Sequence, residues 1–313
     1  MRSSSGLLVV LACAAGLPVL CRQPDKDVFA GRWDLTITTP QKTYPSWMEF
    51  TGTSENPEIR IVGRVASVHP ATDVKQEGAR LSFRSSESFG KEIPVAWELT
   101  ISGNRITGIQ KREDGVTGQI VGAPAPALKH KVPVIWSDPE PLFNGKDLSG
   151  WIPDAPSKHH WKAGGGALVN EQAGANIRTK RRFNDFRLHI EYNCPKDGNS
   201  GVYLRGRYEV QVEYEPPDEN DKFHKMGSIY GFLAPAVDVT PRPGQWETYE
   251  ITLVGRTVTV MRDGELIIDQ QQIPGITGGA LDSHQGEPGP IYLQGDHTGG
   301  MKYRNITISV PKR

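Results

Sequence analysis

Short segments in which polar and apolar side chains alternate are the feature of this sequence that most constrains its fold. They recur from residue 30 to residue 310 and are separated by turns rich in Gly, Pro and Asn. A period of two is typical of a half-buried β-strand, whereas the apolar stripe of a surface helix repeats about every 3.6 residues. The alternation therefore predicts an all-β chain, with strands at 33–38, 46–50, 58–63, 80–83, 96–101, 187–192, 201–205, 208–213, 248–253, 257–261, 291–294 and 305–309.

The strands fall into two groups, and 313 residues are enough for two domains of ordinary size. Residues 26–125 predict a small antiparallel β-barrel or sandwich, and their Gly31-Arg-Trp33 opening resembles the start of lipocalin-like barrels. Residues 122–127 read Gly-Ala-Pro-Ala-Pro-Ala, a composition that disfavours strand pairing, so a linker is expected over 122–140. Residues 141–313 predict a two-sheet sandwich of jelly-roll type.

The first 21 residues predict a secretory signal peptide. A basic residue at Arg2 precedes a seven-residue apolar run at 6–12, which is too short to span a bilayer. Residues 10–13, Val-Leu-Ala-Cys, also resemble the lipobox of bacterial lipoproteins, although cleavage near Cys13 by an ordinary signal peptidase explains the same pattern. We therefore expect export to the periplasm or cell envelope, with a lipid anchor as the one route to a membrane.

The overall charge disfavours polyanionic partners. The chain carries 36 acidic and 36 basic residues, so its formal net charge is zero. Nucleic acids and anionic membrane surfaces are usually bound by a net positive field. We accordingly expect no nucleic acid partner and a substrate that is neutral.

Polar side chains share one face of a predicted strand in the second domain. Because successive residues in a strand point to opposite faces, Glu209, Gln211 and Glu213 emerge together while the intervening valines face the core. The same parity extended back through the preceding turn adds Tyr203 and Arg205. We expect Glu191, in the neighbouring segment, to lie on the same surface. Acids, amides, an arginine and a tyrosine on one surface are typical of a sugar site.

Four stretches in the second domain, taken in order, resemble one family. They are Leu-Phe-Asn-Gly-Lys-Asp-Leu-Ser-Gly-Trp at 142–151, Gly-Asn-Ser-Gly-Val-Tyr-Leu-Arg at 198–205 with Tyr-Glu-Val-Gln at 208–211, Pro-Gly-Gln-Trp-Glu-Thr-Tyr-Glu at 243–250, and Gly-Pro-Ile-Tyr-Leu-Gln-Gly-Asp-His at 289–297. Residues from about 140 to 310 are similar to the 3-keto-disaccharide hydrolase family. The resemblance implies a concanavalin A-like jelly-roll sandwich, kin to the family 16 glycosidases, that hydrolyses glycosides oxidised to a ketone at sugar carbon 3.

The resemblance and the residues together suggest two chemistries. The Glu-x-Gln-x-Glu strand resembles the Glu-x-Asp-x-Glu strand of family 16 glycosidases, in which the outer acids are nucleophile and acid/base, but Gln211 replaces the middle acid. A ketone at carbon 3 instead acidifies the hydrogen on carbon 2, so that one base can start an elimination. His297 and Glu209 are the candidate bases, with Glu213 as a further catalytic acid. The candidate substrate-binding residues are Arg205 and Gln211 as donors, Asp296 beside His297, Tyr203, Glu191, Gln294, and Tyr230 as a stacking surface.

A non-catalytic, lectin-like sugar-binding module is the alternative from another class, because lectins and glycosidases share this sandwich. Several acids and His297 on one surface would favour catalysis, whereas exposed aromatic rings without a buried acid would favour binding. No cofactor is assigned. The acidic, Pro-rich stretch at 215–227 is expected to form a loop at the rim of the sheet and could hold a divalent cation such as calcium, but it lacks a twelve-residue ligand spacing.

Overall fold

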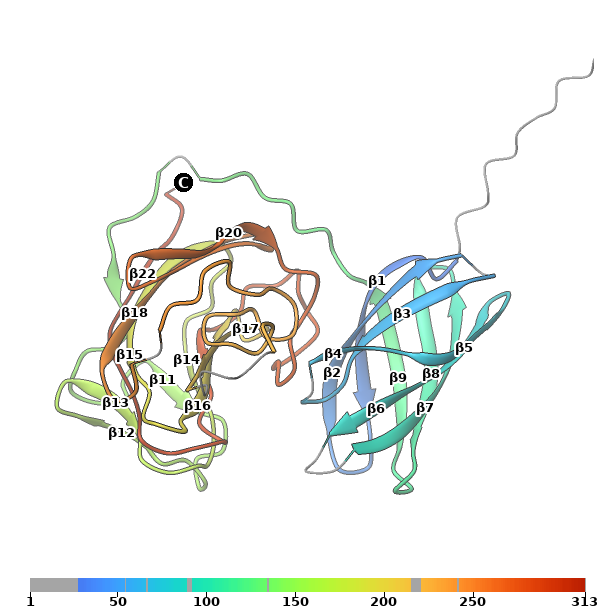
Figure 1. Cartoon of the computed structure of the whole chain (residues 1–313), viewed down its shortest axis with the longest axis horizontal. Coiled ribbons are helices and arrows are strands. Elements are labelled where there is room, and N and C mark those ends of the chain that lie inside the picture. The colour runs from blue at the N-terminus through green and yellow to red at the C-terminus, as the bar shows by residue number, and fades with distance from the viewer. Residues whose placement is uncertain are drawn as a thin grey trace, which may run out of the picture.

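The computed structural model describes residues 28–312 except 54, 66, 89–91, 134, 215–220 and 241. The expected signal peptide lies outside the described residues, as does much of the acidic loop. The described residues form two β-rich bodies joined by an extended segment (Figure 1) and contain no helix. Accordingly, no described helix has the length and apolar character needed to span a membrane.

The first domain is an antiparallel meander. Within the described residues its strand order is β4-β3-β2-β1-β9-β8-β7-β6-β5. The strands are β1 (Gly31–Thr38), β2 (Thr43–Gly52), β3 (Pro57–Val62), β4 (Val68–Pro70), β5 (Thr72–Glu77), β6 (Arg80–Ser88), β7 (Glu92–Ser102), β8 (Arg105–Arg112) and β9 (Thr117–Pro124).

A bent strand closes this meander into a barrel. Ala71 alone separates β4 from β5, and β4 pairs with β3 while β5 pairs with β6. The Ala71 amide donates to the Ile59 carbonyl at 2.8 Å, so the bend itself stays attached to β3. The interior is packed with buried apolar side chains, including the stacked rings of Phe83 and Trp97. Trp33 of the lipocalin-like motif belongs to this core, and its indole N–H donates to the Phe29 carbonyl at 2.8 Å.

The predicted linker begins too early. Gly122, Ala123 and Pro124 are the end of β9, and they pair with residues of β1 down to Trp33. A proline lacks an N–H but still fits the terminal position of a strand, where no further ladder bond is required. The irregular connection therefore runs from about residue 125 to β10 at Glu140–Pro141.

The second domain contains two antiparallel sheets. The larger has the order β12-β13-β22-β15-β18-β19-β20, with β10 also paired to β22, and the smaller has the order β11-β14-β21-β16-β17. Besides β10, the strands are β11 (Trp151–Pro153), β12 (Trp161–Gly164), β13 (Ala167–Asn170), β14 (Ile177–Thr179), β15 (Phe186–Asn193), β16 (Asn199–Leu204), β17 (Tyr208–Glu213), β18 (Trp246–Val254), β19 (Thr257–Arg262), β20 (Glu265–Gln272), β21 (Tyr292–Leu293) and β22 (Met301–Ser309).

One apolar core joins the two sheets of the second domain. Leu188 and Ile190 of β15 and Val210 and Val212 of β17 are each at most 1 % exposed and belong to the same cluster. The chain is thus all-β, a jelly-roll-type sandwich preceded by a small antiparallel barrel.

The barrel packs directly on the sandwich. Trp47 of β2 is fully buried within the core cluster of the sandwich, and its ring meets Phe232 edge-on at 5.3 Å. On another side of the contact, the hydroxyls of Thr36 and Ser283 lie 2.9 Å apart. Independent folding of residues 26–125 and 140–313 was expected from the two complete sets of strands and stays a prediction, but the two domains share a buried apolar contact.

Candidate active site

Strand β17 presents alternating residues to the core and to a cavity. Tyr208, Val210 and Val212 are fully buried in the core, whereas Glu209, Gln211 and Glu213 line a cavity of about 490 Å³. The side chains therefore divide between the two faces as the sequence alternation predicts.

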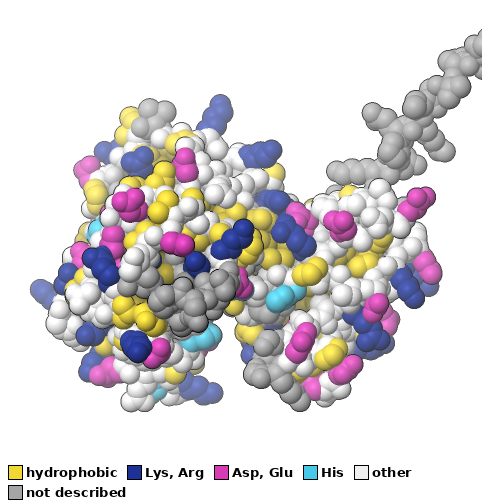
Figure 2. All heavy atoms as spheres, in the orientation of Figure 1, with side chains coloured by type: hydrophobic (Ala, Val, Ile, Leu, Met, Phe, Trp, Pro, Cys, Tyr) yellow, Lys and Arg dark blue, Asp and Glu magenta, His cyan; other side chains and the backbone are white. Residues whose placement is uncertain are grey.

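Both domains contribute to this cavity. The sandwich supplies the three polar residues of β17 together with residues of β16, β21 and nearby loops. The barrel supplies the turn between β1 and β2, the first residues of β2 and the segment that follows β3. Figure 2 shows the surface hollowed between the two bodies. The barrel residues are Lys42, Thr43, Tyr44, Pro45, Arg64 and Val65.

Glu209 is a buried acid held by one hydroxyl donor. Its carboxylate accepts a hydrogen bond from the Tyr203 hydroxyl at 2.8 Å, and the residue is 3 % exposed. Gly201 on β16 leaves room for it, because a Cβ there would lie 2.0 Å from Glu209 Oε1. Burial raises the pKa of Glu209 to about 8, with the charges of Asp296 and Glu213 adding to the rise. Glu209 is therefore mostly protonated at pH 7 and ionises in mild alkali.

Glu213 is held by two amides. Asn199 Nδ2 donates to one carboxylate oxygen at 2.8 Å and Gln211 Nε2 donates to the other at 2.8 Å. Burial raises the pKa of Glu213, and these hydrogen bonds and the nearby His297 act against that rise. Glu209 and Glu213 thus emerge on the same face of β17, but their carboxyl groups have different hydrogen-bond partners.

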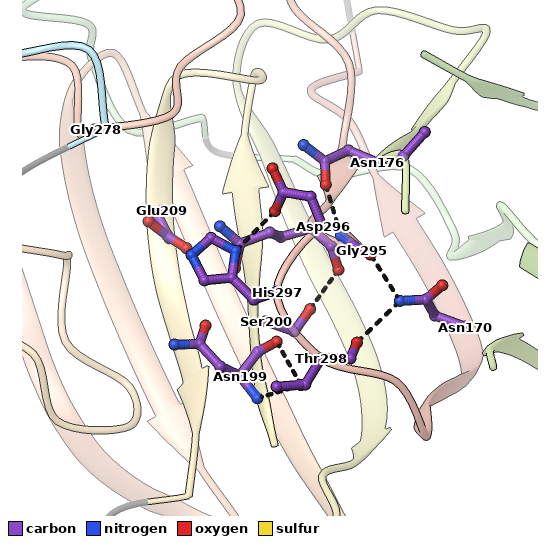
Figure 3. Close-up of polar contacts among 12 residues, drawn as sticks. Asn170, Asn176, Asn199, Ser200, Glu209, Gly278, Gly295, Asp296, His297 and Thr298 are labelled. Atoms are coloured by element: carbon purple, nitrogen blue, oxygen red, sulfur yellow. Dashed lines mark hydrogen bonds and ion pairs between the residues drawn. The ribbon is translucent and has the colours of Figure 1, made fainter. Parts of the chain in front are cut away.

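His297 and Asp296 form a pair at the edge of the cavity. His297 Nδ1 lies 2.8 Å from Asp296 Oδ1, and this hydrogen bond together with the Asp296 charge raises the pKa of His297 above 6.5. Figure 3 shows both side chains in front of the strand that carries Glu209. His297 can therefore carry a proton near neutral pH and release it to a reacting group.

Asparagines and a threonine fix the loop that carries this pair (Figure 3). The Gly295 amide donates to Asn176 Oδ1 at 2.6 Å, and the Gly295 carbonyl accepts from Asn170 Nδ2 at 3.0 Å. On the other side of the pair, the Thr298 hydroxyl donates to the Asn199 carbonyl at 3.1 Å. These side-chain contacts tie the loop to the strands and orient Asp296 and His297.

Two buried amide oxygens in the cavity wall have no partner among the described residues. They belong to Gln211, which is 2 % exposed, and Gln294, which is 8 % exposed. A buried acceptor without a partner is costly, so a ligand hydroxyl or water is needed to satisfy it. Sugar hydroxyls supply donors of this kind.

Tyr230 lies next to Glu209 because its segment runs along β17. The Tyr230 amide donates to the Glu209 carbonyl at 3.1 Å, and the Gly227 amide donates to the Gln211 carbonyl at 2.9 Å. The Tyr230 ring also contacts His224, with ring centres 4.5 Å apart. Tyr230 thus forms part of the cavity wall at the position where a stacking surface was expected.

The structure brings most of the candidate residues together. Tyr203, Tyr230, Gln294, Asp296 and His297 all line the cavity with the three polar residues of β17. It does not bring Arg205 and Glu191 to this cavity, so the expectation that these two share its surface is wrong.

Arg205 is displaced by the turn between β16 and β17. It adopts a left-handed backbone with φ of 53°, which breaks the alternation that was extended through this turn. Its guanidinium is buried elsewhere, donating to the Gly255 carbonyl at 2.7 Å and lying over the ring of Tyr208 on the core face of β17.

Glu191 obeys the predicted alternation but belongs to the other sheet. Strand β15 pairs with β18 and β22, and Glu191 accepts hydrogen bonds from Arg304 and Asn305 at 2.6 Å each. Periodicity assigns a residue to a face of its strand but does not say which sheet holds the strand.

Several lining residues were not anticipated. Asn199 lies in the family-like motif at 198–205 and His224 lies in the acidic stretch at 215–227, but neither was expected to line the site. Lys42, Tyr44 and Arg64 come from the barrel, where no sequence signal connects them to a site more than a hundred residues away.

The described residues contain no group of three or more His, Cys, Asp or Glu side chains arranged to hold a metal ion. Residues 215–220, which belong to the 215–227 stretch considered for calcium, lie outside the described part of the chain.

The decisive comparison concerns residues 138–309, which match the 3-keto-alpha-glucoside-1,2-lyase-like domain family. The chain belongs to this family. The match covers more than half of the chain and the whole sandwich wall of the cavity, so membership supports a protein that acts on glycosides. The barrel lies outside the match, and no curated protein matches the chain.

Three solved structures that are similar to part of this chain are named as glycoside-cleaving proteins. A proposed glycosyl hydrolase from Parabacteroides distasonis is 30 % identical, with a TM-score of 0.48, over 57 % of this chain and 92 % of that one. A second from the same organism is 18 % identical, with a TM-score of 0.46, over 56 % and 94 %. A non-specific endo-β-1,3(4)-glucanase of glycosidase family 16 is 10 % identical, with a TM-score of 0.32, over 60 % and 96 %.

Proposed function

We propose that the protein cleaves glycosides whose sugar carries a ketone at carbon 3, by elimination followed by addition of water. The family name supports a lyase reaction on 3-keto-glucosides. The observation that carries the proposal is a buried glutamate, Glu209, with a pKa of about 8, in one cavity with the Asp296-His297 pair. A base that ionises near the working pH is what abstraction of an acidified carbon-bound hydrogen requires.

In the proposed reaction, ionised Glu209 removes the proton from carbon 2 and the electron pair forms an enediolate with the carbonyl at carbon 3. Tyr230 is the donor toward that oxygen, because it lines the cavity with Glu209 and a phenolic hydroxyl stays protonated at neutral pH. The bond from carbon 1 to the aglycone oxygen then breaks as the double bond forms between carbons 1 and 2. The imidazolium of His297 gives its proton to the departing oxygen, and water later adds across the double bond to give net hydrolysis.

The remaining lining residues bind and orient the sugar in this scheme. Gln211 and Gln294 accept hydrogen bonds from its hydroxyls through their unpartnered amide oxygens. Tyr203 holds the Glu209 carboxylate in place. Glu213, anchored by Asn199 and Gln211, accepts from a further hydroxyl.

The test compares a 3-keto-glucoside with its unoxidised parent. We expect the 3-keto form to be cleaved at least about 100-fold faster, because the parent lacks the acidified hydrogen that a general base can use. In deuterium oxide, NMR should also show enzyme-dependent exchange at carbon 2. Equal cleavage of the parent, with no exchange, would reject elimination.

A retaining glycosidase is the second candidate, and the difference between the two glutamates favours it. Burial raises the pKa of Glu209 to about 8, as a general acid requires, whereas the Glu213 carboxylate accepts hydrogen bonds from Asn199 and Gln211, an environment suited to a nucleophile. Cleavage of the unoxidised parent with retention at carbon 1 would support it. A lectin-like module would bind both glycosides and cleave neither. The buried acid, which binding alone does not require, argues against that alternative.

We also propose that the protein acts outside the cytoplasm. The proposal rests on the basic start and apolar run of the first 21 residues. Fractionation of the source cell, with and without these residues, tests it.

A further inference from the structure

The barrel gives the cavity a second wall with a different charge. The sandwich wall carries the carboxyl groups of Glu209, Glu213 and Asp296, whereas the charged side chains on the barrel wall are Lys42 and Arg64. Because the family match begins at residue 138, this basic wall is an addition to the family domain.

The basic wall is held in place by the domain contact. The Lys42 carbonyl accepts from the Thr39 amide at 2.9 Å, which fixes the turn between β1 and β2. The Arg64 carbonyl accepts from the Gly279 amide at 3.2 Å, which ties the barrel to a sandwich loop that also lines the cavity. Gly275 lies so close to Trp47 that a Cβ there would be 2.2 Å from the indole nitrogen. The two domains therefore fit closely, and the backbone that carries the two cations is held at a fixed position relative to the acids.

Lys42 and Arg64 form a pair of like charges. Partial desolvation in the cavity and then repulsion by the Arg64 charge lower the pKa of Lys42, whereas the charge of Asp296 across the cavity raises it. No carboxylate of the described residues lies within ion-pair distance of the Lys42 ammonium, which lies 5.9 Å from the centre of the Tyr44 ring. Arg64 already interacts with the buried Glu87 carboxylate, where its positive charge opposes the rise in the pKa of that group. The Lys42 ammonium is therefore the cation that an anion in the cavity would stabilise most.

We propose that Lys42 and Arg64 bind a carboxylate on the substrate, carried outside the 3-keto sugar ring, and so make the barrel the specificity-determining part of the site. This inference rests on the proposed function, since the carboxylate is placed on the glycoside that Glu209 attacks. It also revises the expectation of a neutral substrate, which came from the net charge of the whole chain. Net charge averages over a surface and does not report two cations gathered in one cavity.

The test uses two 3-keto-glucosides that differ in one group, a para-carboxyphenyl and a para-carbamoylphenyl aglycone. We expect the full-length protein to prefer the carboxylate about tenfold in kcat/KM, and expect the preference to shrink at high salt because salt screens a partly exposed charge pair. Lys42→Gln should remove most of this preference. Arg64→Gln should reduce it as well, but Arg64 is half-buried, so the exposed Lys42 is the safer substitution.

Lys111→Gln is the matched control, because Lys111 is an exposed barrel lysine paired with Glu98 and does not line the cavity. It should keep the wild-type preference. A wild-type preference near one, or the same preference in Lys42→Gln, overturns the inference. If neither 3-keto compound is cleaved, the proposed function fails, and calorimetric binding of the two unoxidised glucosides then decides the inference separately. Tighter binding of the carboxylate that Lys42→Gln abolishes supports it, and equal binding rejects it.

Discussion

The two walls of the cavity solve different physical problems. On the sandwich wall Glu209 is 3 % exposed and accepts from Tyr203, and Glu213 is held by two amides, so each acid has a set position and a shifted pKa. On the barrel wall Lys42 is exposed and extends from a turn. Buried, oriented groups suit the transfer of protons, whereas exposed charges suit the selection of a ligand.

The two walls also differ in their relation to the family domain. The sandwich wall lies within residues 138–309 and the barrel wall lies outside them. Changes in the sandwich wall should therefore affect the rate for every substrate, and changes in the barrel wall should affect the choice among substrates. Substitutions in the sandwich wall test whether its residues affect the rate for every substrate.

The largest expected effect is that of Glu209→Gln on the rate. The amide keeps the shape of the side chain but cannot accept a proton, so kcat on a 3-keto-glucoside should fall by about 10²–10⁴-fold. Steady-state kinetics and deuterium exchange at carbon 2 should show the same loss. Glu191→Gln is the control, since Glu191 faces Arg304 on the other sheet, and it should retain the wild-type rate. A Glu209→Gln enzyme within tenfold of wild type would remove Glu209 from the chemistry.

The strands and much of the sandwich wall could be predicted from the sequence. Alternation is a local property, so it assigned Glu209, Gln211 and Glu213 to one face without knowledge of the fold. The prediction failed at Arg205, where a left-handed turn residue interrupts the alternation, and at Glu191, where the choice of sheet depends on long-range pairing. A one-residue break in register is enough to reverse the face of every side chain beyond it.

The contribution of the barrel to the cavity could not be predicted from alternation, for a different reason. Lys42 lies in a turn, and turn lysines are usually solvated. Its place in the site follows from the docking of two domains through Trp47 and Phe232, a contact between residues far apart in the sequence. Trp47 was predicted as part of a strand, but the sequence did not reveal that its ring enters the core of the other domain.

The second largest expected effect is that of Glu209→Gln on the free energy of unfolding, and it depends on pH. The pKa of Glu209 is about 8 in the folded protein, against 4.5 when unperturbed, so the unfolded state releases its proton first. This group therefore lowers the free energy of unfolding progressively as pH rises from 4.5 to 8. Glu209→Gln removes that loss and should be more stable than wild type at pH 8.5 by a few kcal/mol at most, with little difference at pH 4.5.

Urea unfolding at the two pH values measures this difference, and Glu191→Gln provides a control of opposite sign. Hydrogen bonds from Asn305 and Arg304 outweigh burial and lower the pKa of Glu191, so this residue adds stability above its unperturbed pKa. Glu191→Gln should therefore be slightly less stable than wild type at pH 8.5. A Glu209→Gln protein that gains nothing between pH 4.5 and 8.5 would show that Glu209 ionises normally.

The smallest expected effect concerns the pH optimum of Asp296→Asn. The Asp296 charge and hydrogen bond raise the pKa of His297, and the same charge raises the pKa of Glu209. Removing the charge should lower both pKa values, so both limbs of the kcat/KM profile move to lower pH together and the rate at pH 8 falls. Asp269→Asn, an exposed change on β20, should leave the profile in place. If Asp296→Asn lowers the rate equally at every pH, Asp296 positions the loop without tuning either proton transfer, and the assignment of His297 as the proton donor loses its electrostatic support.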